Sequence, residues 1–267
     1  MTGQETNGTG AGAGAGRKAS LPKRFYKDVA VKDEGGEAVL LLDGKPVRTP
    51  GKAPLALPTR AAAEALAEEW RAQGDRIDPE TMPLTRFANS AIDGVRGREQ
   101  AVAADIVRHA GSDLLSYRPE GPQGLVAAQA KHWDPVLAWA ERALDAPLRL
   151  VAGIVHVEQP APSLDAIARR LEAFDTFGLA ALHVMTQLTG SALLPLAVAL
   201  GQLTPDEAWA AAHVDEDFQI AQWGEDAEAA GRRAHRKRDF DAAVRMLALL
   251  NTSSMSWMAG TSPAMTS

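Results

Sequence analysis

The segment from residue 213 to residue 240 carries the side chains best suited to recognising another molecule. It reads HVDEDFQIAQWGEDAEAAGRRAHRKRDF, with acids and two large aromatic rings followed by basic residues. On a helix, one stripe contains Glu216, Ile220, Trp223 and Ala227, and the neighbouring acids flank it. An aromatic ring beside carboxylates suits a binding patch, because the ring supplies affinity and the charges supply orientation. The pattern therefore indicates a possible partner-binding surface.

A solvated helix face explains the same residues without any partner. Acids near the start of a helix and bases near its end are stabilising in themselves, and Glu228 and Arg232 have the spacing of an i,i+4 ion pair. For the basic run 232–238 we favour this simpler interpretation. For the acidic part with Trp223 both interpretations stay open.

Patterns typical of catalysis or cofactor binding are absent from the sequence. It contains no P-loop, no dinucleotide-binding glycine motif, no H-E-x-x-H and no G-x-S-x-G. The lack of cysteine excludes thiolate metal sites and thiol nucleophiles. The six histidines are dispersed, and His183, in an apolar segment, fits a core histidine better than a ligand or base. We expect no catalytic residues, metal or cofactor; an enzyme whose site unites distant residues, such as His183 and nearby acids, is the alternative.

Composition fits a globular protein without a general affinity for polyanions. The chain has 267 residues, 46% hydrophobic and 23% charged, and a net charge of −6. The negative charge argues against nucleic acid or an anionic membrane as a partner.

Segment 178–201 is long enough to cross a bilayer, which takes about 20 residues. Its polar residues and Pro195 favour instead two buried helices that meet near Gly190-Ser191, with a membrane-docked factor as the alternative.

The elements that would position these residues change type once along the chain. Up to Pro58 the pattern predicts strands, and Asp43-Gly44 is a two-residue hairpin turn because glycine tolerates positive φ. Beyond it the period is helical, which predicts an α+β fold. Candidate strands are 25–31, 38–42, 45–49 and 53–57. Candidate helices begin at Thr59 and at Thr204 and cover 98–111 and 123–145. Asp134-Pro135 should start a new helix within 123–145 or kink this one. A further helix runs from a Ser163 cap to about 188.

Nine short motifs, in order along residues 24–248, carry a resemblance to a known family. They are RFYKDVAV, LDGKPVRTP, LALPT, EEW, MPLTRFANSAID, DLLSYR, QAKHWDPVLAW, LTGSALLPLAVALG and DEDFQIAQWGEDAEAA. Together they resemble the assembly chaperones that hold the α subunit of the ATP synthase catalytic head before it pairs with β. The resemblance implies a small N-terminal α/β domain and a larger all-α domain built as an orthogonal bundle.

The resemblance also implies domain limits and a way of working. We expect disorder in 1–22, an N-terminal domain over 23–97, a helical domain over 98–250 and a flexible tail over 251–267. The family masks the apolar surface that β would cover on the α subunit, by equilibrium binding without ATP hydrolysis. We expect a monomer, in the bacterial cytoplasm or, for a eukaryotic chain, the mitochondrial matrix, without stable membrane insertion.

The same resemblance implies roles for individual residues. Trp70, in EEW, resembles a position important to the family's integrity, and its place after Ala62 and Leu66 indicates core packing. Glu216, in DEDFQ, resembles the family's functional acidic position. Its expected neighbours in partner binding are Asp215, Phe218, Gln219, Trp223 and Gly224.

Overall fold

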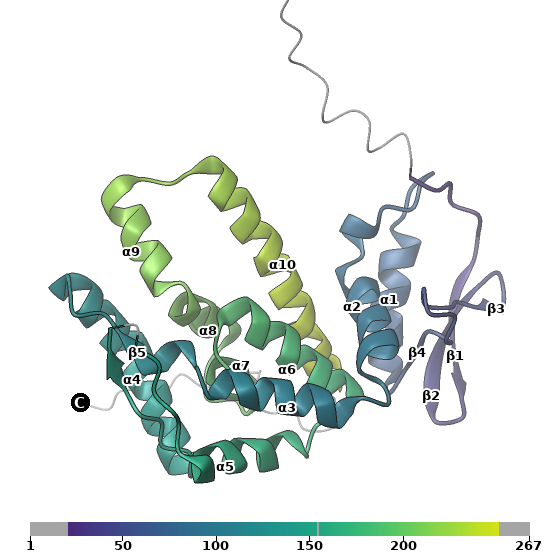
Figure 1. Cartoon of the computed structure of the whole chain (residues 1–267). Coiled ribbons are helices and arrows are strands. Elements are labelled where there is room, and N and C mark those ends of the chain that lie inside the picture. Colours follow the sequence, from purple (N-terminus) through teal and green to yellow (C-terminus); the bar gives the residue numbers. More distant parts are fainter. Residues whose placement is uncertain (1–20, 154, 251–267) are drawn as a thin grey trace, which may run out of the picture.

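A small sheet region precedes a larger helical region in this protein (Figure 1). The structure, a computed structural model, describes residues 21–153 and 155–250. Four antiparallel strands and the first two helices form the N-terminal part, and the remaining helices follow. The predicted α+β fold class is confirmed. Of residues 1–22, for which disorder is predicted, 1–20 lie outside the described residues, as does the whole flexible tail predicted for 251–267.

The sheet centres on strand β2 (Glu37–Leu42), which pairs antiparallel with β1 (Val29–Glu34), β3 (Lys45–Pro46) and β4 (Ala56–Leu57). The predicted hairpin turn is confirmed, because Asp43 and Gly44 both have positive φ, 47° and 77°. The strand predicted over 25–31 begins only at residue 29. The carboxylate of Asp43 accepts the backbone N–H groups of residues 27 and 28, so a side chain takes the place of a strand partner there.

Helices α1 (Arg60–Arg71) and α2 (Pro83–Ser90) complete the N-terminal region. The side chain of Thr59 accepts the N–H of Ala62 at 3.1 Å, which confirms the predicted cap. Leu66 is fully buried in the core, as its place on the predicted stripe requires. Short turns adjoin α2: η2 (Pro79–Thr81) before it and the π-helical turn η3 (Ala91–Val95) after it.

The helical region contains eight α-helices within the described residues. They are α3 (Glu99–Ala110), α4 (Gln123–Leu144), α5 (Ala161–Leu171), α6 (Thr176–Thr189), α7 (Leu193–Ala199), α8 (Pro205–Ala212), α9 (Val214–Trp223) and α10 (Ala227–Leu250). A short turn η4 (Leu114–Ser116) leads into β5 (Tyr117–Arg118), which pairs in parallel with β6 (Val151–Ala152). In Figure 1, α3 and α5 run across the direction of α10, as in the predicted orthogonal bundle. The capping box at Thr204 is confirmed at the start of α8.

Three predictions about helix ends are wrong. Helix α4 continues through Pro135, whose side chain is exposed, so no new helix starts there; the alternative of a kink stays a prediction. Ser163 lies inside α5 rather than capping it, since its hydroxyl donates to the carbonyl of Pro147 at 2.7 Å. The helix predicted to reach residue 188 is two helices, because the side chain of Asp175 accepts the N–H of Gly178 and starts α6.

The apolar segment 178–201 is confirmed as two buried helices. Helix α6 ends before Gly190, whose φ of 70° turns the chain, and α7 follows. The fully buried Asp113 accepts the backbone N–H groups of Ala192 and Leu193 at the start of α7, and burial raises the pKa of this carboxyl to about 6. Among the described residues, no helix combines the length and apolar character needed to cross a membrane.

Helix α10 connects the two regions through the core. It packs on α6 in the helical region and on α1 and α2 in the N-terminal region. One continuous cluster of buried side chains extends from Leu40 in β2 to Leu247 in α10. The domain boundary between residues 97 and 98 stays a prediction.

Candidate partner-binding site

Helix α9 and the first turns of α10 form a hairpin that projects from the body of the protein (Figure 1). Of the ten residues of α9, only Val214 is buried. Most helices in globular proteins are stabilised by burying an apolar face. Because α9 buries almost none, specific contacts with its neighbours must hold it in place.

Three contacts supply this support. The amide of Gln129 in α4 donates to the carboxylate of Asp215 at 2.6 Å. The ring of Phe218 packs over Gly124 of α4 so closely that a Cβ there would lie 3.1 Å from it. From α10, Arg233 donates to Asp217, and this hydrogen bond raises the pKa of Arg233. Helix α9 is therefore fixed from both sides.

The basic run of α10 has more than one role. Arg232 forms the predicted ion pair with Glu228 and is exposed to solvent. Arg236, by contrast, donates to the carbonyl of Leu188 at the end of α6. Lys237 pairs with Asp241 at 2.6 Å and with Asp206 of α8 at 3.3 Å. The solvated-face interpretation holds for Arg232, whereas Arg233, Arg236 and Lys237 attach α10 to its neighbours.

A pocket of about 320 Å³, here called the α9 pocket, lies at the base of the projecting hairpin. Residues of α4, α6, α8, α9 and α10 line it. Two of the predicted site residues, Asp215 and Glu216, are part of its wall. The side chain of Glu216 is 35% exposed, and its nearest cation, the Nε of Arg233, is 4.0 Å away.

His213 also lines the α9 pocket and is 4% exposed. Its Nδ1 lies 2.8 Å from the carbonyl oxygen of Trp209. Because a carbonyl only accepts, Nδ1 carries the proton and Nε2 presents a lone pair. This Nε2 is enclosed, yet it has no hydrogen-bond partner in the part of the chain that the structure describes. Burial lowers the pKa of His213, which favours the neutral form of the ring.

The outer end of α9 exposes the remaining predicted site residues. Gln219 and Trp223 are exposed, Trp223 by 76%, and Gly224 ends the helix with a φ of 87°. Residues seven apart lie on nearly the same face of a helix and about 10 Å apart along it. Trp223 therefore stands on the same face as Glu216, two turns farther from the pocket. Five of the six predicted residues of this segment thus lie on one short helix, and the sixth, Gly224, directly follows it.

Trp70 belongs to α1, which lies in the N-terminal region, apart from α9 (Figure 1). Its half-buried ring contacts Tyr26 edge-on with the ring centroids 5.5 Å apart, and its carbonyl accepts the hydroxyl of Tyr26 at 2.7 Å. The indole N–H is enclosed without a partner among the described residues. Trp70 thus packs where α1 meets the sheet, consistent with a structural role.

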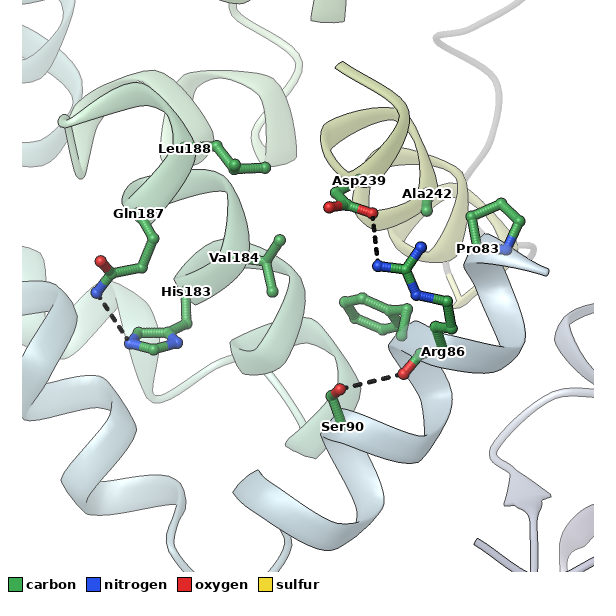
Figure 2. Close-up of a pocket in the computed structure, with 10 residues that line it drawn as sticks. Pro83, Arg86, Ser90, His183, Val184, Gln187, Leu188, Asp239 and Ala242 are labelled. Atoms are coloured by element: carbon green, nitrogen blue, oxygen red, sulfur yellow. Dashed lines mark hydrogen bonds and ion pairs between the residues drawn. The ribbon is translucent and has the colours of Figure 1, made fainter. Parts of the chain in front are cut away.

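A second pocket, between α2, α6 and α10, bears on the enzyme alternative (Figure 2). It holds about 380 Å³ and contains Arg86, His183 and Asp239. Figure 2 shows Arg86 and Asp239 directed toward each other, with an ion pair of 3.5 Å, while His183 turns toward Gln187 on the far side. The Nε2 of His183 is 2.8 Å from Asp105, and the ring is partly exposed rather than in the core as predicted. These titratable groups do not converge on one point.

No group of three or more potential metal ligands occurs within residues 21–153 and 155–250.

Sequence patterns did not single out Gln129, His213, Arg233 or Arg236 as parts of the site. Gln129 carried one usable signal, since it is a polar residue beside the apolar stripe through Val126, Ala130 and Trp133. The sequence carried no usable signal for His213, because its burial at the pocket depends on which elements pack against it.

Comparisons with known proteins all lead to one family. The model of the family described as ATP12 chaperone protein matches residues 23–141. The chain is 52% identical to a putative chaperone from Agrobacterium tumefaciens of known crystal structure, with a TM-score of 0.83 and coverage of 86% of this chain and 87% of that one. It is 44% identical to Atp12 from Paracoccus denitrificans, with a TM-score of 0.81 and coverage of 86% and 98%.

A curated relative extends the comparison to a eukaryote. The mitochondrial protein atp12 of Schizosaccharomyces pombe is 26% identical over 225 residues, which are 78% of this chain and 77% of the relative. The family and these relatives are named as chaperones or as Atp12 proteins, in agreement with the expectation that the chain is not an enzyme. With matching sequence, fold and length, this chain belongs to the ATP12 chaperone family.

Proposed function

We propose that this protein is a chaperone of ATP synthase assembly that binds the unassembled α subunit and prevents its aggregation until it pairs with β. Membership of the ATP12 family supports a chaperone role. The sequence motifs that resemble chaperones of the α subunit support the choice of client. We further propose that it acts as a monomer, in the cytoplasm if the chain is bacterial.

The observation that carries the proposal is the exposure of α9. A helix that leaves nine of its ten residues incompletely buried, with Trp223 76% exposed, gains little stability from apolar burial inside the chain. The contacts of Gln129, Gly124 and Arg233 nevertheless hold this helix in one position. A rigid aromatic side chain among carboxylates is a suitable anchor for a partner.

We propose that the client contacts Asp215, Glu216, Phe218, Gln219, Trp223 and Gly224, and that Trp70 maintains the fold. The protein binds the surface of α that β covers in the assembled head. Release therefore requires only that β competes for this surface. No nucleotide and no cofactor takes part in this scheme.

Purified α subunit provides the direct test. The wild-type protein should form a complex with α in size-exclusion chromatography and suppress light scattering by α at elevated temperature. Glu216→Lys should weaken the complex at least tenfold, because the reversed charge faces the same partner surface. Glu172→Lys is the matched control, since Glu172 is exposed at the end of α5, away from α9. Equal binding by wild type and Glu216→Lys would contradict the assigned surface, and a wild type that does not bind α would contradict the proposed client.

A further inference from the structure

Two buried hydrogen-bond acceptors in and beside the α9 pocket have no donor among the described residues. His213 Nε2 is one of them, enclosed on a residue that lines the pocket and is 4% exposed. Gln129 does not itself line the pocket, but its amide donates to Asp215 in the pocket wall, and its Oε1 is a second buried acceptor without a donor. A buried acceptor without a donor costs about 1–3 kcal/mol, so a site that keeps two of them calls for an explanation.

The charges around the pocket do not satisfy these acceptors. Arg236 lines the pocket, but its guanidinium donates to the carbonyl of Leu188. Arg233 donates to Asp217 and approaches Glu216 only to 4.0 Å. Within the described residues, the carboxylate of Glu216 receives no hydrogen bond, so it too presents free acceptor capacity to the pocket.

We propose that the α9 pocket binds a cationic side chain, arginine or lysine, of the client polypeptide. The guanidinium or ammonium group would donate to His213 Nε2 and to the carboxylate of Glu216. A neutral acceptor beside a carboxylate matches a group that carries several donors and a positive charge. This inference rests on the proposed chaperone function, because it assigns the pocket to the client.

Trp223 extends the recognition beyond the pocket. It lies on the same face of α9 as Glu216, about 10 Å farther along the helix. A client segment would therefore place its cation in the pocket and an apolar side chain against Trp223. Such a combination discriminates against segments that are only apolar, because they would leave His213 and Glu216 without donors.

Nitrogen NMR of the full-length protein with ¹⁵N-labelled histidine tests the pocket directly. The probe is N-acetyl-arginine amide, and N-acetyl-norleucine amide is the uncharged control of similar length. Titration with the arginine probe should move the His213 Nε2 resonance upfield in a saturable manner, because a lone pair that accepts a hydrogen bond is shielded. The norleucine compound should leave the resonance in place.

Two variants separate the pocket from a general electrostatic effect. Glu216→Gln should weaken binding of the arginine probe at least tenfold, whereas Glu172→Gln should leave it unchanged. His213→Phe keeps an aromatic ring against Trp209, whose ring centroid lies 4.0 Å from that of His213, and removes the acceptor. It should bind α at least fivefold more weakly while its melting temperature shows that it is folded.

The outcomes distinguish this inference from the proposed function. If wild type binds α but the arginine probe moves His213 no more than norleucine does, the pocket inference is wrong and the proposed function stands. An unchanged affinity of His213→Phe for α leads to the same conclusion. If the probe binds in the pocket but α does not bind the protein, the cation site is supported and the proposed client is wrong.

Discussion

Gln129 of α4 and Asp215 of α9 are joined by a hydrogen bond of 2.6 Å, although 86 positions separate them in the sequence. Gln129 is 2% exposed, so its amide reaches Asp215 from inside the body of the protein. The bond fixes the start of a helix that buries little else. It thereby couples the packing of the helical region to the position of the candidate binding surface.

Loss of this bond should loosen α9 without unfolding the protein. Gln129→Leu removes the donor but also the unpartnered Gln129 Oε1, so the free energy of unfolding should change by less than about 1 kcal/mol. Hydrogen exchange in α9, measured by mass spectrometry, should accelerate about tenfold because local opening becomes easier. Gln222→Leu, at an exposed position of the same helix, is the control. Unaltered exchange in α9 would show that Gln129 is not the support we assign.

Trp223 should contribute to binding and not to stability. Because its side chain is 76% exposed, Trp223→Ala should change the free energy of unfolding by less than about 0.5 kcal/mol. The same variant should bind α at least tenfold more weakly, as expected for an aromatic anchor. Phe25→Ala is a matched control, since Phe25 is 72% exposed but lies in the N-terminal region. Equal losses of affinity in both variants would indicate non-specific apolar contact.

Trp70 should contribute to stability. Trp70→Ala removes a half-buried ring that packs against Tyr26 and both core clusters, and should cost about 3 kcal/mol in urea unfolding. Trp70→Phe keeps most of this packing and removes the unpartnered indole N–H, so it should cost less than about 1 kcal/mol. If the two variants lose the same stability, the packing explanation fails.

Asp113 should be among the most sensitive single positions for stability. Its carboxylate accepts the backbone N–H groups of Leu115, Ala192 and Leu193, all within the core. Asp113→Ala leaves these donors unpaired and should cost about 3 kcal/mol or more. Asp113→Asn retains one acceptor oxygen and should be intermediate. A loss below about 1 kcal/mol for the alanine variant, measured by chemical denaturation, would contradict this role.

Asp105 should make stability depend on pH in the acid range. Hydrogen bonds from Arg108 and then His183 lower the pKa of its carboxyl from 3.8 to about 2. A lowered pKa in the folded state means that the stabilisation is present above about pH 4 and is lost as pH falls toward 2. Because the side chain is 28% exposed, solvent screening limits the effect to about 1 kcal/mol.

Urea unfolding of wild type and Asp105→Asn between pH 2 and pH 6 tests this predicted loss of stability at acid pH. The stability difference between the two proteins should be largest at the upper end and shrink toward pH 2. Asp165→Asn, at an exposed position of α5, should show no such trend. A difference between wild type and Asp105→Asn that stays constant over this range would rule the mechanism out.

The sequence by itself determined most of the local structure. The turn at Asp43-Gly44, the cap at Thr59 and the capping box at Thr204 were predictable, because each depends on residues only a few positions apart. The acidic and aromatic residues of α9 were predictable as a group for the same reason. The motifs also sufficed to recognise the family.

Only the tertiary structure decided how α9 is used. The predicted stripe ran from Glu216 through Trp223 to Ala227, but Gly224 ends the helix and places Ala227 on α10. In the folded protein Glu216 lines the α9 pocket and His213 is buried. The guanidinium of Arg236 donates to the carbonyl of Leu188. These relationships join elements far apart in the chain. Their physical cause is the packing of α9 on α4 and of α10 on α6, together with the hydrogen bond from Arg233 to Asp217, which no periodicity within a single segment encodes.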